Sequence, residues 1–386
     1  MIALSRRSVL AGAAGLGAAA CWASPLGWGV PAPQRPRLVV LALDGGADGL
    51  AVAPPVGDPA YEGLRRGLSI RSPLRLDGDF GLHPALKQLA GMAEAGELRL
   101  APAAASPSLS RSHFMEQDIL QSGVADPRGA RSGWLNRAVA QLGAQGTLRA
   151  VTLDDAAKMA TQGEVAFASP SAGLSTDMAW RLEQLYRGDP ELLRLVEVSR
   201  AAQVMAEDGA LPQAVAEPGE VVNARKAGRL LAAPDGPSTV YLTLGGFDTH
   251  QAQGAEQGPL AARLGLLDAI LGALKAESGA AWAHTAVVVF TEFGRTVRPN
   301  GDGGTDHGAA GTAMLLGGAL KAGGLLGDWP GLARLHEDRD LRPGLDLRSL
   351  FKGVLAEHWG LDRRVLETEI FPDSTAAPLL TGLVRT

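Results

Sequence analysis

An uninterrupted hydrophobic run begins at Arg37 and ends at Asp44, with no alternation between apolar and polar positions. Such a run is typical of a strand whose two faces are both covered. Further strands are predicted, from similar short apolar runs, over residues 97–104, 238–246, 285–291 and 311–320. The chain therefore contains several buried strands that lie far apart in the sequence.

Stretches of helical periodicity separate these strands. Apolar residues three or four positions apart predict helices over residues 83–96, 112–123, 258–279 and 346–362. Region 124–237 is also mostly helical in pattern, and we interpret it as a helical insertion or cap. Strands that alternate with long helices predict an α/β fold with a mainly parallel central sheet and helices on both faces.

Residues 1–32 differ from the rest of the chain. Arg6 and Arg7 precede a mildly hydrophobic stretch of Ala, Gly and Leu, which is the layout of an export signal rather than of a membrane span. The residues around this pair resemble the twin-arginine motif, which implies an interaction with the twin-arginine export machinery after folding. We expect a signal peptide, a single mature domain over 33–386, and a periplasmic or secreted protein. Cys21 follows three alanines, so lipid anchoring remains an alternative.

Composition narrows the class of protein further. The 386-residue chain has one cysteine, so an intramolecular disulfide is excluded. Its formal net charge is -5, and no block of Lys and Arg stands out after residue 40, which argues against a nucleic-acid partner. The 50 glycines fit a protein with many tight turns and close backbone approaches.

Ionisable residues follow or precede four of the predicted strands. They are Asp44 after the first, Asp248 and His250 after 238–246, Glu292 after 285–291, and Asp306 with His307 in a glycine-rich loop before 311–320. In parallel sheets, ligands gather beyond the carboxyl ends of the strands. We therefore expect these side chains to converge at one edge of the sheet.

Their chemistry points to a metal ion. Carboxylate oxygens with neutral imidazoles form the ligand set of borderline divalent metals such as zinc, manganese or iron. Clustered carboxylates would also repel one another unless a cation neutralised them. Taken one at a time, each residue could instead be a turn former or helix cap. Together they predict a divalent metal, zinc or manganese, with one or two ions.

Five motifs carry a resemblance to a known family. The strings LDGGADGL, RSHFMEQD, GGFDTH, FTEFGRT and TDHG, in this order, resemble the exported DUF1501 family of bacterial proteins, which is similar to the alkaline phosphatase and sulfatase superfamily. The resemblance covers residues 37–365. It implies an alkaline-phosphatase-like fold more strongly than it implies a chemistry.

The resemblance also implies roles for single residues. Asp44 matches the carboxylate that touches the metal beside the nucleophile, and Asp248 with His250 matches a second metal position. His307 matches the late histidine before a final strand of the sheet. Phe293 stands where the superfamily usually has a ligand, so one ion is favoured over two.

Hydrolases of that superfamily carry a nucleophile at the start of a helix. Ser112 is the preferred candidate and Ser110 the second, with helix capping as the alternative role of these serines. His113 is a candidate substrate contact or proton carrier. Arg295 could bind two oxygens of a phosphate or sulfate, or could form an ordinary ion pair.

The leading hypothesis is an exported metal-dependent hydrolase of phosphate or sulfate esters on small molecules or polymers, with a serine nucleophile. An alternative is a non-catalytic, metal-stabilised binding or assembly protein of the cell envelope. A phosphomutase-like transferase is a third possibility, less favoured because an exported location has no supply of nucleotide.

Overall fold

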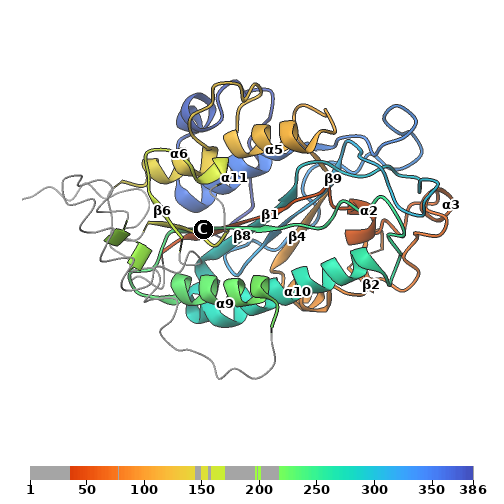
Figure 1. Cartoon of the computed structure of the whole chain (residues 1–386), viewed down its shortest axis with the longest axis horizontal. Coiled ribbons are helices and arrows are strands. Elements are labelled where there is room, and N and C mark those ends of the chain that lie inside the picture. Colours follow the sequence, from red (N-terminus) through yellow and green to blue (C-terminus); the bar gives the residue numbers. More distant parts are fainter. Residues whose placement is uncertain are drawn as a thin grey trace, which may run out of the picture.

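Figure 1 shows the protein as a computed structural model, which describes residues 35–76, 78–143, 149–154, 158–169, 196–197, 199–200 and 217–385. The predicted signal peptide and Cys21 lie outside the described residues. So do residues 170–195 and 201–216, which make up much of the predicted helical insertion.

An eight-stranded sheet forms the centre of the protein, in the order β10-β4-β9-β8-β1-β7-β5-β6. Every pairing is parallel except those of β9, which runs antiparallel to both β4 and β8. The strands are β1 (Arg37–Leu43), β4 (Leu98–Ala105), β5 (Ala150–Thr152), β6 (Phe167–Ala168), β7 (Thr239–Leu244), β8 (Thr285–Thr291), β9 (Gly311–Leu316) and β10 (Leu345–Asp346). A separate two-stranded sheet pairs β2 (Leu74–Arg75) with β3 (Gly81–Leu82). The predicted α/β class and mainly parallel sheet are confirmed.

Helices cover both faces of the large sheet (Figure 1). One face carries α4 (Lys87–Glu94), α9 (Gly219–Ala232) and α10 (Pro259–Ser278), and the other carries α5 (His113–Ser122), α6 (Trp134–Gln141) and α11 (Leu347–Trp359). Shorter helical elements are α2 (Gly49–Val52), α3 (Tyr61–Leu64), η2 (Met159–Thr161), η4 (Gly279–His284), α12 (Arg363–Val365) and the π-helical η5 (Leu366–Ile370).

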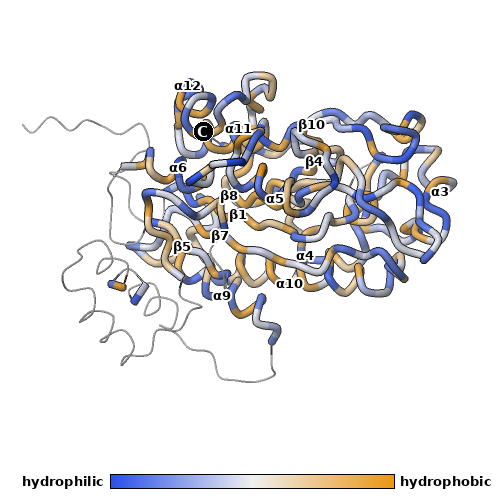
Figure 2. The backbone as a smooth tube through the Cα atoms, turned by 45° about the horizontal axis from the view of Figure 1, so that its top comes forward, coloured by the Kyte–Doolittle hydropathy of each residue, from blue (hydrophilic) through white to orange (hydrophobic). Residues whose placement is uncertain are grey.

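Strand β1 shows how the two cores are divided. Val39, Leu41 and Leu43 pack in the core under α9 and α10, whereas the intervening Leu38 and Val40 pack in the core under α6 and α11. Successive side chains of a strand point to opposite faces, so an unbroken apolar run satisfies both cores. The hydropathy colouring in Figure 2 accordingly shows hydrophobic central strands.

Two helix boundaries follow from local hydrogen bonds. Helix α4 begins at Lys87 rather than at the predicted residue 83, because the amide of Ala85 donates to Nδ1 of His83 (3.1 Å) and forms a turn there. Helix α11 begins after Asp346, whose carboxylate accepts from the amide of Arg348 at 2.9 Å, as an N-cap does.

The described parts of 124–237 belong to the main layers. Strand β5 pairs with β7 and β6 pairs with β5, so both extend the central sheet, while α6 and α9 cover its two faces. This segment was predicted to be mostly helical, and the two short strands were not foreseen. A cap formed by the remaining residues stays a prediction.

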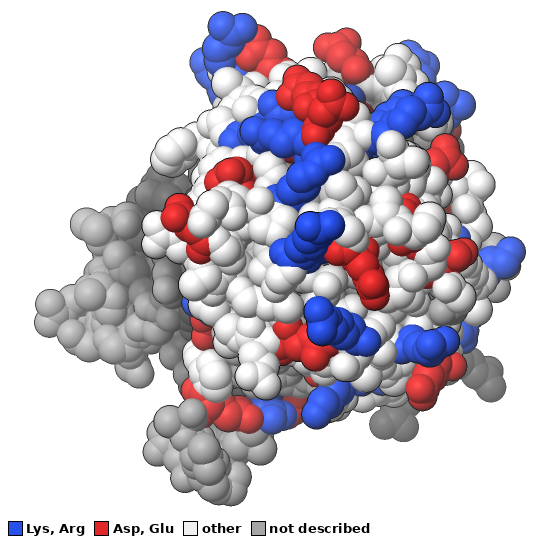
Figure 3. All heavy atoms as spheres, turned by 90° about the vertical axis from the view of Figure 1, so that its right-hand side faces the viewer, with Lys and Arg blue, Asp and Glu red and all other residues white. Residues whose placement is uncertain are grey.

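Among the helices of the described residues, none combines the length and the hydrophobicity that a transmembrane segment requires. The face of the protein seen in Figure 3 carries Lys and Arg side chains interspersed with Asp and Glu.

Candidate metal centre

Three parallel strands deliver the candidate residues to one edge of the sheet. Asp44 directly follows β1, the segment Asp248 to His250 follows β7, and Glu292 directly follows β8. His307 comes from the loop before β9 and is held beside Arg295 by an antiparallel backbone bridge. Because β1 pairs with both β7 and β8 in parallel, these three carboxyl ends lie side by side.

Asp248, His250 and His307 form a tight triangle of ligand atoms. Oδ1 of Asp248 lies 2.9 Å from Nε2 of His250 and 3.1 Å from Nε2 of His307. The two Nε2 atoms lie 3.0 Å apart. Tetrahedral ligands about 2.0 Å from a zinc ion would be separated by about 3.3 Å, so a small movement of these groups accommodates an ion.

Nδ1 of His307 and Nδ1 of His250 each lie against an oxygen acceptor. Nδ1 of His307 lies 2.9 Å from the carbonyl oxygen of Arg111, which can only accept, so this nitrogen is the donor. Nδ1 of His250 lies 3.2 Å from a carboxylate oxygen of Asp306. The two Nε2 atoms that face each other cannot both carry a proton at 3.0 Å. At least one of them presents a bare lone pair.

Asp306 is itself held as an anion. Its Oδ1 accepts from Nδ2 of Asn300 at 3.1 Å, and this hydrogen bond, with that to His250, lowers the pKa of the Asp306 carboxyl although partial burial raises it. Nδ2 of Asn300 also donates to the backbone carbonyl of His250 at 2.8 Å. Asn300 and Asp306 together therefore orient the His250 ring.

His113 joins this group from the first residue of α5. Its Nδ1 lies 2.7 Å from Oε1 of Glu292, and its Nε2 is buried, makes no hydrogen bond within the described chain and lies 3.4 Å from Oδ2 of Asp248. Ligand atoms of His113, Asp248 and His307 all lie within 4.8 Å of one another. The hydrogen bond to Glu292 raises the pKa of His113.

Glu292 lies behind His113 and is 3% exposed. Its Oε1 also accepts from the amide of Gly45 at 2.8 Å and from Nε2 of Gln117 at 3.2 Å. Burial raises the pKa of Glu292, but the hydrogen bonds from His113 and from backbone amides outweigh it and hold the pKa below its usual value. The carboxylate is therefore ionised and orients the imidazole.

Arg295 is buried beneath the triangle. Its guanidinium donates to the carbonyl oxygens of Gly45, Gly46, Thr305 and Phe247 and to Oδ1 of Asp248. Burial raises the pKa of Asp248, but the bond from Arg295 offsets this and the net pKa is lowered. The donors of Arg295 face backbone and Asp248, and its side chain has no exposed surface.

Asp44 lies slightly apart from the histidines. Its Oδ2 pairs with Nζ of Lys158 at 3.0 Å, and both side chains are about one quarter exposed. Burial raises the pKa of Asp44, against the opposing effect of Lys158. This pairing was not foreseen from the sequence, because nothing in the residues around 158 indicates that they return to the end of β1.

Phe293 lines the apolar side of the centre. Its ring centroid lies 4.8 Å from that of His113 and 4.7 Å from that of His307. At this position the side chain supplies a wall against two imidazoles and no ligand atom.

Ser112 is the N-cap residue of α5 and is exposed, but its side chain makes no capping hydrogen bond. It follows a strained turn, in which Leu109 and Arg111 adopt φ values of 55° and 60°. The side chain of Arg111 pairs with Asp340 at 2.7 Å, which fixes the carbonyl that His307 contacts. Ser112 therefore lies in the chain between Arg111, whose carbonyl contacts His307, and His113.

The groups that hold His250 and His307 in place were not predicted from the sequence. Neither the Arg111 carbonyl nor Asn300 has a side-chain motif that would indicate contact with a histidine. The sequence predicts His113 as a substrate contact or proton carrier, and the structure brings its Nε2 close to Asp248 and His307. The available signal was the SHF string at a predicted helix start.

Comparisons with known proteins give a family and distant structural likenesses. The family model described as "Protein of unknown function (DUF1501)" matches residues 99–370, well over half of the chain. A comparison with curated proteins gave no match. The solved structures that resemble the chain include the C-terminal periplasmic domain of EcEptC from Escherichia coli in complex with Zn, at 12% identity and a TM-score of 0.38, covering 73% of this chain and 72% of that one.

Another is Ps i-CgsB in complex with k-i-k-neocarrahexaose, at 11% identity and a TM-score of 0.43, covering 90% of this chain and 77% of that one. Both likenesses are distant.

Proposed function

The chain belongs to the DUF1501 family, whose function is unknown, and from its own geometry we propose that it is a metal-dependent hydrolase of phosphate or sulfate esters. The observation that carries the proposal is the orientation of three imidazoles. His113, His250 and His307 each have Nδ1 against an oxygen acceptor and Nε2 toward Asp248.

This arrangement fits a cation better than it fits a structural hydrogen-bond network. Metal-bound histidines characteristically donate Nδ1–H to a carboxylate or carbonyl, which fixes the tautomer that presents Nε2. A hydrogen-bond network leaves a conflict at these three atoms: with one proton on the two Nε2 atoms, a bare lone pair faces Oδ1 of Asp248, and with two protons, two N–H groups face each other. A cation between the atoms satisfies all three. A buried Nε2 without a hydrogen bond, as in His113, also costs free energy unless it has a partner.

We propose His113, Asp248, His250 and His307 as the ligands of one divalent ion, zinc or manganese. Glu292, Asp306 and the Arg111 carbonyl then act as positioning groups, which revises the ligand roles expected for the two acidic residues. Asp44, paired with Lys158, remains a candidate for a neighbouring position. When bound, such an ion polarises the ester oxygens and favours the alkoxide form of a nucleophile.

Ser112 is our proposed nucleophile. It is exposed, its hydroxyl is not used as a cap, and it precedes His113 directly at the start of the ten-residue helix α5. A helix N-terminus favours both an alkoxide and an incoming anion. Nε2 of the adjacent His113 lies 3.4 Å from Oδ2 of Asp248, so the start of α5 lies at the triangle.

We propose Lys158 rather than Arg295 as the cationic contact for the ester. Arg295 has no exposed surface and its donors are engaged with carbonyl groups and Asp248. Nζ of Lys158 is bound to Asp44 alone among the described residues, and the lysine side chain is one quarter exposed. Its charge can therefore be shared with a substrate oxygen, as a compact ammonium does.

The proposed location is outside the cytoplasm. The twin-arginine-like segment at Arg6 and Arg7 supports export of the folded protein, and export after folding suits a metal that is loaded in the cytoplasm. Replacing both arginines by lysine should leave the unprocessed protein in the cytoplasmic fraction. Unchanged export of this variant would contradict the proposed route.

The activity is tested by elemental analysis of the purified protein followed by turnover of aryl phosphates and aryl sulfates with added Zn²⁺ or Mn²⁺. We expect about one ion per chain, hydrolysis of one ester class, and loss of turnover with retained metal in Ser112→Ala. A protein without metal or turnover in every condition would overturn the proposal. Stoichiometric metal without turnover would support the binding or assembly protein instead.

A further inference from the structure

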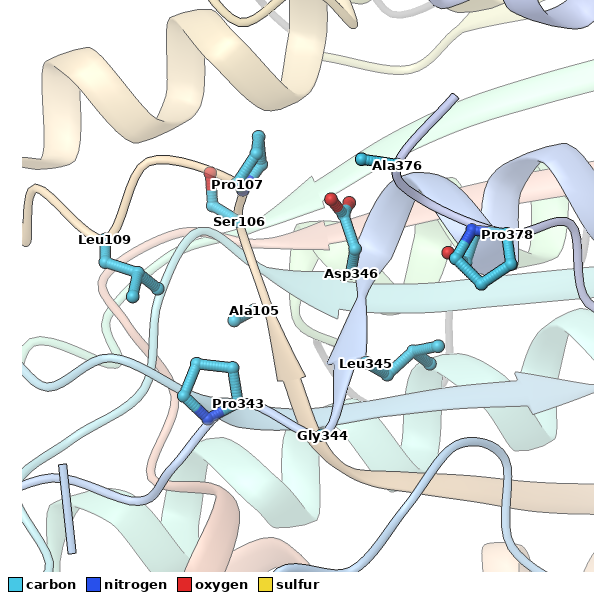
Figure 4. A pocket seen from close by; sticks show the side chains of 11 residues that line it. Ala105, Ser106, Pro107, Leu109, Pro343, Gly344, Leu345, Asp346, Ala376 and Pro378 are labelled. Carbon is cyan, nitrogen blue, oxygen red and sulfur yellow. The ribbon is translucent and has the colours of Figure 1, made fainter. Parts of the chain in front are cut away.

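A cavity lies at the same edge of the sheet, outside the metal centre. It has a volume of about 360 Å³, at the small end of the range for ligand pockets. Figure 4 shows the residues that line it, among them Ser106, Asp346 and Pro378. None of them belongs to the proposed metal centre.

The cavity lies beyond the carboxyl ends of β4 and β10. Strand β4 ends at Ala105, which pairs in parallel with Asp346 at the end of β10. Only β9 separates β4 from β8, so the cavity lies two strand spacings, roughly 10 Å, along the sheet from the strand that carries Glu292. This is the edge at which ligands of parallel sheets bind.

Two hydroxyl groups in the cavity wall lack hydrogen-bond partners in the described part of the chain. Ser106 is 4% exposed and Ser349 is 0% exposed, and the Oγ atom of each makes no hydrogen bond there. Buried polar groups are normally paired, because an unpaired one loses its hydration without compensation. Both side chains line the cavity, so a polar ligand could supply the missing bonds.

The charge of the wall disfavours an ionic ligand. Asp346 is the charged side chain that lines the cavity, and Figure 4 shows its carboxylate on the wall beside Ser106 and Ala376. Its oxygens accept from Nε of Arg348 at 3.1 Å and from Nη2 at 2.7 Å. The carboxylate repels an anion, and the paired guanidinium reduces the attraction for a cation.

The remaining wall is apolar and stiff. Three prolines, Pro107, Pro343 and Pro378, line the cavity together with Leu109 and Leu345. Proline rings have few conformations to lose on binding. This surface therefore suits a compact ligand that has apolar faces of C–H groups and polar edges. A ring that carries several hydroxyl groups has this character.

We propose that the cavity between β4, β10 and the start of α11 binds an uncharged polyol of the size of a monosaccharide. The hydroxyl groups of the ligand exchange hydrogen bonds with Ser106 and Ser349 and donate to Asp346, while its carbon faces lie against the prolines. This site does not depend on the proposed ester hydrolysis and is tested by binding.

The test is saturation-transfer NMR of the purified protein with glucose, galactose, mannose and myo-inositol, each titrated to saturation. Glucuronate and glucosamine serve as charged counterparts, since neither is an ester of phosphate or sulfate. We expect saturable binding of at least one uncharged probe and weaker binding of both charged probes. No saturable signal from any uncharged probe, or equal binding of the charged ones, would overturn the assignment.

Variants locate the binding. Ser106→Ala and Ser349→Ala should each weaken the affinity about fivefold, a typical effect of one neutral hydrogen bond, without lowering the melting temperature. Ala376→Phe, on the exposed rim, should abolish binding by filling the cavity. Ser374→Ala is the matched control, because its hydroxyl is equally buried and unpaired in the described chain but does not line the cavity. Equal loss of affinity in that control, or undiminished binding by Ala376→Phe, would refute the location.

Discussion

The Nε2 atoms of His250 and His307 lie 3.0 Å apart, although each ring is anchored at Nδ1 by a separate oxygen acceptor. Two lone pairs that face each other this closely are stable when a proton or a cation lies between them.

Chelation should therefore destabilise the folded protein. At free metal about 100-fold above the Kd, binding contributes about 2.7 kcal/mol to the free energy of unfolding. We expect a chelator to lower the melting temperature by about 5 °C and added Zn²⁺ to restore it, measured by calorimetry. His250→Ala should show neither response. An unchanged wild-type melting temperature would argue against the metal.

Asp306→Asn separates a positioning group from a ligand. The amide can no longer accept a charge-assisted hydrogen bond from Nδ1 of His250, so metal affinity should fall about 10- to 100-fold, as for other groups behind metal ligands. His250→Ala should cost more. Competition with a chromophoric chelator measures both values. If Asp306→Asn costs as much as the loss of His250, Asp306 is itself a ligand.

Arg295 should be a stability residue. Arg295→Ala leaves the carbonyls of Gly45, Gly46 and Thr305 without this donor in a buried site, so the free energy of unfolding should fall by about 3 kcal/mol or more. Arg295→Lys should recover little, because an ammonium cannot reach carbonyls on opposite sides. Denaturant unfolding tests this. If Arg295→Ala keeps full stability but raises KM, the result would instead support the contact between Arg295 and a phosphate or sulfate that the sequence predicts.

The buried His358 should make stability depend on pH. Burial lowers the pKa of His358 to about 4, and its Nε2 lies 2.8 Å from the carbonyl of Arg37. The unfolded chain binds this proton below about pH 6.5, so the contribution is complete above that pH and is lost as the pH falls toward 4. The loss amounts to about 3 kcal/mol at most.

His358→Gln should remove this part of the acid sensitivity, as seen in urea unfolding at pH 7, 6, 5 and 4. His336→Gln is the control, since this histidine is only partly buried and its side chain lies 3.8 Å from Glu337. Parallel acid profiles of wild type and His358→Gln would contradict the expectation.

Gly45 should tolerate no side chain. Its φ is +118°, and a Cβ there would lie 2.6 Å from the amide nitrogen of Asp248. Gly45→Ala should therefore lower stability by several kcal/mol and displace Asp248, with loss of metal binding. Gly63→Ala, where a Cβ meets nothing within 4 Å, is the matched control. Equal melting temperatures of Gly45→Ala and wild type would show that the backbone after β1 can accommodate a side chain.

The pattern of apolar residues is sufficient to predict the sheet class and the position of the central strands. An apolar run such as 37–43 satisfies two cores at once, and that pattern is local. The residues after β7 and β8 were also foreseen, because parallel strands bring their carboxyl ends to one edge.

The contacts of those residues depend on the tertiary structure. Whether Glu292 contacts an ion or Nδ1 of His113 depends on where the start of α5 lies. The two residues are 179 positions apart in the sequence. The same holds for Lys158 beside Asp44, and for the Arg111 carbonyl behind His307. The type of each residue determines the chemistry of its side chain. The partner of each polar atom depends on long-range packing, which no local sequence pattern indicates.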